Sequence, residues 1–167
     1  MKLGLNVLVA GHCPPEGSWS SVLRAMGASM VEQRGYAPLL VQVSLEEVLA
    51  SPTQPRIFGD CLAVADAQML GLGHPLVVVT VLEAREGSRA AFQPRHVLLR
   101  VFPSIPSELD AKWIETLTSC LEDSDLLREL TETKTPLAFG VALQKALRSD
   151  SLGRNASNGV VQGDTCE

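Results

Sequence analysis

The sequence predicts a single α/β domain with four or five strands over about residues 1–148. Segments with the composition of strands alternate with segments in which apolar residues recur at helical spacing. One segment, residues 75–82, is apolar and largely β-branched without alternation, which is typical of a strand buried on both faces. Residues 149–167 are rich in Ser, Gly, Asn and Asp, and we expect them to form a disordered polar tail.

The first elements are a short strand over residues 5–10 and a helix that ends near Arg34. Ser18 or Ser20 is positioned to cap the start of this helix, and Gly35 is positioned to end it. The apolar residues of the helix recur at steps of three and four: Val22, Leu23, Met26, Met30 and Val31.

A second strand is predicted over residues 36–43. Ser44 and Glu47 then have the spacing of a capping box, with the serine as N-cap and the glutamate three residues later. We therefore expect a short helix over residues 45–50. Pro52 ends this helix, because proline cannot continue one.

The middle of the chain predicts further strands and two connections. A third apolar stretch covers residues 57–65, and residues 66–74 read as a loop of mostly small residues. The clearest strand follows at residues 75–82. A charged connection over residues 83–94 then leads to another strand at residues 96–102.

The C-terminal third predicts three helices. The first covers about residues 109–121, and Ser124 is positioned to cap the second. Thr135 and Pro136 are typical of a helix start, because a capping residue precedes a proline in the first turn. The third helix runs from there to about Arg148.

The composition excludes several classes of protein. With 46% hydrophobic and 20% charged residues among 167, the chain can form a core. It has no apolar run of about 18 residues, so we expect no membrane span. A net charge of −5 and 4% aromatic residues argue against nucleic-acid binding. The first residues lack the long apolar core of a secretory signal, so we expect a cytoplasmic location.

No metal site and no cofactor is expected. The chain lacks the nucleophile-elbow serine motif, the Walker loop, the zincin HExxH motif and the dinucleotide-binding glycine motif. The cysteines stand far apart and form no CxxC pair, which argues against a zinc or thioredoxin-like site: Cys13, Cys61, Cys120 and Cys166. Whether the chain is an enzyme stays open on these grounds.

Asp66 and His74 are the two candidate catalytic residues. Asp66 follows an apolar run at the end of a predicted strand, where open α/β sheets place functional side chains. Its alternative role is to cap the following loop. His74 precedes the central strand and could accept a phosphoryl group or carry a proton, or it could simply pack against the strand edge. We expect His96, at the start of a later strand, to lie on the surface.

A surface with charges of both signs is the candidate site for a protein partner. Arg85, Arg89 and Arg95 form a local basic segment, whereas residues 108–132 are strongly acidic. Complementary charges orient a docking protein and raise its association rate. The alternative is that these charges only solvate helix faces and loops.

The order of the elements resembles the IIA component of the bacterial sugar phosphotransferase system, of the fructose, mannitol and nitrogen-regulatory type. The likeness covers about residues 3–146. It rests on the leucine spacing of residues 117–130 and on the helix start at residues 134–136. It also rests on residues 45–49, which lie where the family has a helix before its active-site segment. The resemblance implies a single domain with a mixed β-sheet and packed helices.

The same resemblance implies where the family's site lies. In the family, a Gly-rich stretch leads through a small apolar run to the histidine that accepts the phosphoryl group, and here that stretch is residues 59–66. Asp66 stands in place of the phosphohistidine, Ala65 in place of the preceding proline, and Asp110 near the place of a second histidine. The resemblance implies a regulatory or partner-binding member without the usual phosphohistidine. Its partner would be a phosphocarrier protein, a transporter or a regulated enzyme.

Two alternatives remain open. The chain could be an active phosphoryl carrier in sugar transport or nitrogen regulation, with Asp66 or His74 as the acceptor. An aspartate would form an acyl phosphate, which usually needs a metal or cationic groups to offset the charge. The other alternative is a ligand-sensing domain, or one that resembles a response-regulator receiver through residues 6–10 and 77–80, with Asp66 as phosphoacceptor.

Overall fold

The computed structural model describes residues 7–11, 18–59, 61–82 and 94–158. Within these residues the strands are β1 (Val7–Val9), β2 (Arg56–Phe58), β3 (Leu62–Met69), β4 (Leu76–Val81) and β5 (His96–Pro103). The helices are α1 (Trp19–Arg34), α2 (Pro38–Ala50), α3 (Glu108–Glu122), α4 (Ser124–Thr131) and α5 (Pro136–Asn158).

The strands form one mixed sheet in the order β1-β4-β5-β3-β2. β1 is parallel to β4 and β3 is parallel to β5, whereas β4 with β5 and β2 with β3 are antiparallel. The register between β3 and β5 places Asp66 directly opposite Arg100. The predicted α/β fold with a mixed sheet is therefore confirmed.

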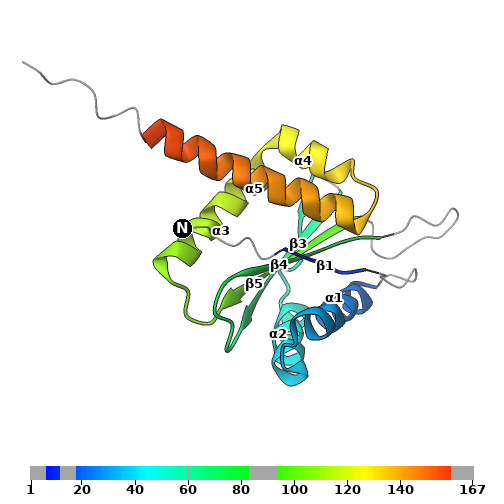
Figure 1. Ribbon diagram of the computed structural model, residues 1–167. Coiled ribbons are helices and arrows are strands. Elements are labelled where there is room, and N and C mark those ends of the chain that lie inside the picture. Colours follow the sequence, from blue (N-terminus) through cyan, green and yellow to red (C-terminus); the bar gives the residue numbers. More distant parts are fainter. Residues whose placement is uncertain (1–6, 12–17, 60, 83–93, 159–167) are drawn as a thin grey trace, which may run out of the picture.

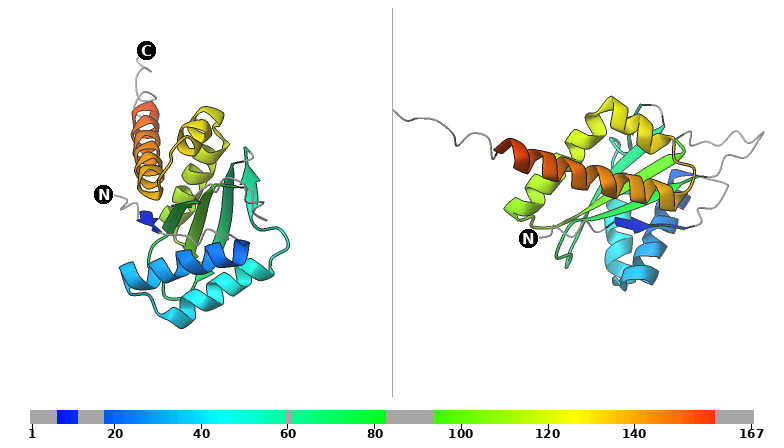
Figure 2. Two further views of the ribbon diagram at one scale, coloured as in Figure 1. Left: turned by 90° about the vertical axis from the view of Figure 1, so that its right-hand side faces the viewer. Right: turned by 45° about the horizontal axis from the view of Figure 1, so that its top comes forward.

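Helices cover both faces of the sheet. In Figures 1 and 2, α1 and α2 lie on one face, and α3, α4 and α5 lie on the other. Because successive side chains of a strand point to opposite faces, the sheet contributes to two separate cores. Its buried residues towards α1 and α2 include Ala63, Ala65, Leu76, Val78, Val97 and Leu99. Those towards α3, α4 and α5 include Leu62, Val64, Val77, Val79 and Leu98.

α1 begins and ends at predicted positions. The backbone N–H of Ser21 donates to the Oγ of the N-cap Ser18 over 3.2 Å. Gly35 ends the helix with a φ of 67°, a left-handed conformation that glycine adopts without steric cost. The N–H of Gly35 donates to the carbonyl of Val31, so the last turn of α1 is closed.

α2 occupies the segment predicted as a strand over residues 36–43, and that prediction was wrong. Pro38 lies in the first turn of α2, where its missing N–H costs no helical hydrogen bond. The buried apolar residues of α2 have helical spacing: Val41, Leu45 and Val48. The predicted capping box was also wrong, because Ser44 lies inside α2 and its hydroxyl donates to the carbonyl of Gln68 in β3, 2.7 Å away.

β3 extends into the segment predicted as a loop over residues 66–74. The ladder with β5 continues to Met69, so Asp66 lies inside a strand and not at its end, and it does not cap the following loop. A carboxylate is tolerated at this position because Arg100 lies beside it and pairs with it. β4 and β5 lie where the sequence predicts them.

The C-terminal helices follow the predicted order. Asp123, and not Ser124, is the N-cap of α4, and its carboxylate accepts backbone N–H groups of the first turn. Thr135 precedes α5, as predicted, and its hydroxyl accepts a backbone N–H. α5 continues to Asn158, and the polar tail over residues 149–167 stays a prediction. None of the helices in the described part of the chain is long and apolar enough to cross a membrane.

Candidate functional site

Asp66 and Arg100 form a bidentate ion pair on the side of the sheet that faces α3, α4 and α5. Asp66 follows Val64 at a spacing of two in β3, and Arg100 follows Leu98 at the same spacing in β5. The Nε of Arg100 donates to Oδ1 of Asp66 over 2.5 Å, and Nη2 donates to Oδ2 over 2.8 Å. The planar guanidinium thus matches both oxygens of the carboxylate.

Arg100 is a buried cation, with 5% of the residue exposed. Its Nη1 donates to the Oγ1 of Thr118 in α3 over 3.0 Å, and the Thr118 hydroxyl donates in turn to the carbonyl of Ile114 over 2.9 Å. A buried charge is costly unless it is paired and hydrogen-bonded. Asp66 supplies the opposite charge and Thr118 supplies a further acceptor, so the site links β3, β5 and α3.

Gln54 holds the backbone of Asp66 on the side away from β5. The backbone N–H of Asp66 donates to Oε1 of Gln54 over 2.7 Å, and Nε2 of Gln54 donates to the carbonyl of Asp66 over 3.0 Å. β2 pairs with β3 only as far as Arg56 opposite Val64, so the Gln54 side chain continues the ladder where β2 has ended. Asp66 is therefore held through its backbone and through its side chain.

Neither of the other predicted site positions joins this ion pair. His74 is exposed in the turn between β3 and β4 and makes no hydrogen bond or ion pair with any described residue. Asp110, near the expected place of a second histidine, lies in the first turn of α3. It forms a capping box with Ser107, whose backbone N–H donates to the Asp110 carboxylate over 2.8 Å. A catalytic role for His74 stays a prediction.

Of the basic residues predicted to contact a partner, Arg95 is the one within the described residues. It is exposed just before β5. Because a strand rises about 3.3 Å per residue, Arg95 lies about 16 Å along the chain from Arg100. Arg85 and Arg89 lie outside the described residues, so the role of the basic segment in partner binding stays a prediction.

His96 is buried, and the prediction that it lies on the surface was wrong. The residue is 4% exposed, and its Nε2 lies 2.7 Å from the carbonyl oxygen of Thr133, to which the neutral ring donates. The ring also packs edge-on against Phe139, at 5.2 Å between centroids. Burial lowers the pKa of His96; the Thr133 hydrogen bond opposes this effect, and the charge of Arg95 adds to it. His96 therefore links β5 to the turn before α5.

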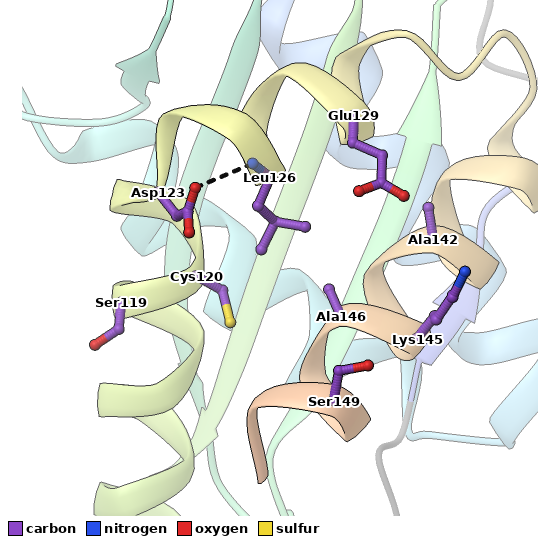
Figure 3. Close-up of a pocket in the computed structure, with 9 residues that line it drawn as sticks. All are labelled: Ser119, Cys120, Asp123, Leu126, Glu129, Ala142, Lys145, Ala146 and Ser149. Atoms are coloured by element: carbon purple, nitrogen blue, oxygen red, sulfur yellow. Dashed lines mark hydrogen bonds between the residues drawn. The ribbon is translucent and has the colours of Figure 1, made fainter. Parts of the chain in front are cut away.

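A groove of about 490 Å³ opens between α3, α4 and α5. Figure 3 shows Cys120 of α3 and Leu126 of α4 on one side of it, and small residues of α5 on the other. The groove is lined by Ser119, Cys120, Asp123, Leu126, Glu129, Ala142, Lys145, Ala146 and Ser149. Its lining combines small and apolar residues with charges of both signs, and its volume lies within the range of sites for small ligands.

The described part of the chain brings together no group of three side chains that could hold a metal ion. Cys61 is exposed and Cys120 is buried. Cys13 and Cys166 lie outside the described residues.

Comparison with known proteins identifies the fold. No protein-family model matches the sequence, and no curated protein matches it. The structure is similar to nitrogen regulatory protein IIA-Ntr from Neisseria meningitidis, with a TM-score of 0.57 and 10% identity over 85% of this chain and 94% of that one. It is also similar to enzyme IIA of the mannitol system of Escherichia coli, in a complex with phosphorylated enzyme IIB. That TM-score is 0.51, with 20% identity over 86% of this chain and 98% of the other.

These similarities define the chain as a domain with the fold of phosphotransferase-system IIA proteins. The predicted resemblance is confirmed at the level of the fold, because the two solved structures share the mixed sheet and helical layers over most of their length. Identities of 10% and 20% describe the fold and not the chemistry of the site.

Sequence reasoning missed the pairing of Arg100 with Asp66. The signal was present, because Arg100 is a single charge inside the apolar strand at residues 96–102. A charge that is buried on a strand needs a partner, and Asp66 is a carboxylate within another apolar stretch. The register between the two strands could not be read from the sequence, so the two charges were not assigned to each other.

Proposed function

We propose that this chain is a IIA-like domain of the phosphotransferase system that acts by binding a protein partner and does not transfer a phosphoryl group through Asp66. The observation that supports this proposal is the bidentate ion pair, in which both carboxylate oxygens of Asp66 accept hydrogen bonds from Arg100. In this reading Asp66 has a structural role at the position where the resemblance implies a phosphohistidine.

The chemistry of acyl phosphates supports the same conclusion. A carboxylate oxygen must attack the incoming phosphorus atom, and a metal or free cationic groups must offset the charge that gathers. The oxygens of Asp66 are bound to Arg100, and no group of metal-ligating side chains lies among the described residues. Attack would weaken the pairing of a guanidinium that is 5% exposed.

Partner binding is supported by a structural relative and by surface charge. The mannitol enzyme IIA of Escherichia coli is seen in a complex with phosphorylated enzyme IIB, so a domain of this fold can bind a protein. In this chain, the groove between α3, α4 and α5 carries exposed Asp123, Glu129 and Lys145, and Arg95 is exposed before β5. Such charges set the orientation of a docking partner. The partner is a phosphocarrier protein, a transporter or a regulated enzyme, and the proposed location is the cytoplasm.

Intact-protein mass spectrometry tests the part of this proposal that concerns phosphoryl transfer. The chain is incubated with phosphoenolpyruvate, enzyme I and the histidine phosphocarrier protein, alongside an active IIA domain as positive control. We expect the positive control to gain one phosphate and this chain to gain none. A gain that is lost in Asp66→Asn would refute the proposal, and a gain that is lost in His74→Ala would identify His74 as the acceptor of a working phosphoryl carrier.

Ligand sensing is a second candidate function, and the groove between α3, α4 and α5 is the observation that favours it. A ligand that binds only the folded state raises the melting temperature. A screen of small metabolites by thermal unfolding tests this candidate. Stabilisation by a metabolite that disappears in Ala146→Trp, which fills the groove, would support sensing, and stabilisation that persists in this variant would exclude the groove as its site.

A further inference from the structure

We propose that Arg100, held in place by Thr118, is an oxyanion-binding fork in which the carboxylate of Asp66 is the resident anion. The ligand class is a small oxyanion, either a carboxylate or a phosphate. This inference rests on the same ion pair as the proposed function. It concerns the N–H donors of Arg100, which can bind another anion once the Asp66 carboxylate is absent.

The donor arrangement of Arg100 is the first observation. Two of its N–H groups, on Nε and Nη2, point in parallel to the two oxygens of Asp66 over 2.5 and 2.8 Å. This fork geometry fits any carboxylate or phosphate group and is not specific to aspartate. The third hydrogen bond, from Nη1 to Thr118 over 3.0 Å, fixes the plane of the guanidinium without using the fork.

The position of the carboxylate relative to solvent is the second observation. The side chain of Arg100 is 6% exposed, whereas that of Asp66 is 39% exposed. The carboxylate therefore lies on the solvent side of a guanidinium that it covers. Shortening Asp66 would open a path from solvent to the fork, and a small anion could reach the place of the carboxylate.

The backbone at Asp66 gives the third observation. Gln54 binds both the N–H and the carbonyl of Asp66, and the neighbouring residues of β3 stay in register with β5, so neither support uses the Asp66 side chain. Removal of the carboxylate should consequently leave β3 in place and produce a vacant site of defined shape. The floor of that site is Arg100, whose guanidinium also lies over the ring of Phe102, 5.8 Å from its centroid.

Anion rescue tests the inference. Thermal unfolding of the wild-type chain, Asp66→Ala and Asp66→Ala/Arg100→Met is followed while chloride is replaced by millimolar formate or inorganic phosphate at constant ionic strength. We expect a saturable rise in the Tm of Asp66→Ala of about 3–5 °C at a tenfold excess over Kd. The wild-type chain and the double variant should not respond, because the first holds its own carboxylate and the second lacks the fork.

The two anions separate the possible ligand chemistries. A response to formate alone would restrict the site to carboxylates, and a response to both would extend it to phosphate. If neither anion stabilises Asp66→Ala, or if the double variant responds equally, the inference is wrong. If Asp66→Ala is unfolded in chloride, a refolding experiment replaces the melting experiment. The variant is then diluted from denaturant into formate, phosphate or chloride. Recovery in an oxyanion alone supports the site, and equal failure in all three contradicts it.

The result is independent of the phosphotransfer test. Anion rescue of Asp66→Ala would stand even if the wild-type chain gained a phosphate on His74. Conversely, the wild-type chain could gain no phosphate while oxyanions fail to stabilise Asp66→Ala. This pair of results would support the proposed function and contradict the oxyanion site.

Discussion

Arg100 donates to both carboxylate oxygens of Asp66, yet the two side chains differ in exposure, at 6% and 39% respectively. The cost of breaking the pair therefore depends on which partner is removed. Asp66→Asn leaves a buried guanidinium without a counter-charge, whereas Arg100→Met leaves a carboxylate that water can reach. We expect the first substitution to cost about 3 kcal/mol of unfolding free energy and the second about 1–2 kcal/mol.

Urea denaturation of the two variants measures this difference. Arg100→Met keeps most of the aliphatic stem of the arginine, so the lost interaction and not a cavity should set its stability. Equal losses of stability, or a larger loss for Arg100→Met, would show that water does not stabilise the unpaired carboxylate of Asp66.

Gln54→Ala tests the support of the Asp66 backbone. The Gln54 amide pairs with the N–H and the carbonyl of Asp66 over 2.7 and 3.0 Å, so its removal leaves two backbone groups of a half-buried strand without these partners. We expect a loss of about 1–3 kcal/mol in unfolding free energy. Gln42→Ala is the matched control, because Gln42 is exposed on α2 and bonds only to Glu46. A loss no larger than that of the control would contradict the role of Gln54.

Gly140→Ala tests the close packing of α5 on the sheet. A Cβ at this position would lie 2.8 Å from Cγ2 of Val9, which is too close for that side chain to stay in place, and would contact Cγ2 of Val79 at 3.4 Å. We expect destabilisation by about 1–3 kcal/mol. Gly73→Ala is the control, since nothing lies within 4 Å of its Cβ. Stability equal to that of the control would show that α5 lies further from β1.

His96 predicts a pH dependence of stability. Burial, the largest effect, lowers its pKa below the ordinary value of 6.5, so the unfolded chain binds the proton more tightly than the folded one. The stabilising contribution is complete above about pH 6.5 and declines as the pH falls from there to the lowered pKa, with a slope of at most about 1.4 kcal/mol per pH unit.

Denaturation of the wild-type chain and His96→Phe between neutral and mildly acidic pH isolates this contribution. We expect the wild type to lose more stability than the variant on acidification, because the variant has no proton to bind at this position. Parallel curves for the wild type and His96→Phe would rule out the His96 contribution.

Local patterns predicted much of the fold. The β-branched run of β4, the cap at Ser18, the left-handed Gly35 and the Thr135–Pro136 start of α5 each carry a signal within a few residues, and the structure confirms them. α2 was misread because residues 39–43 form a short apolar run that fits a strand as well as a helix. Pro38 was the signal that favoured the helix.

The site depended on information that lies between distant segments. Asp66 could be identified from its place after an apolar run, but its partner is 34 residues away and is set by the parallel register of β3 with β5. His96 was misassigned for the same reason, since the residues that bury it, Thr133 and Phe139, come from the turn before α5 and from α5 itself. Sequence patterns show which side chains are unusual, whereas strand register and helix packing decide what those side chains contact.

A double-mutant cycle on Asp66 and Arg100 tests the central ion pair most directly. Unfolding free energies are measured for the wild type, Asp66→Ala, Arg100→Met and the double variant, all in chloride buffer without oxyanions. We predict that the double variant is more stable than the sum of the single losses implies, with a coupling of about 2 kcal/mol. Losses that add to within about 0.5 kcal/mol would show that the two residues do not interact, and would contradict the structural role assigned to Asp66.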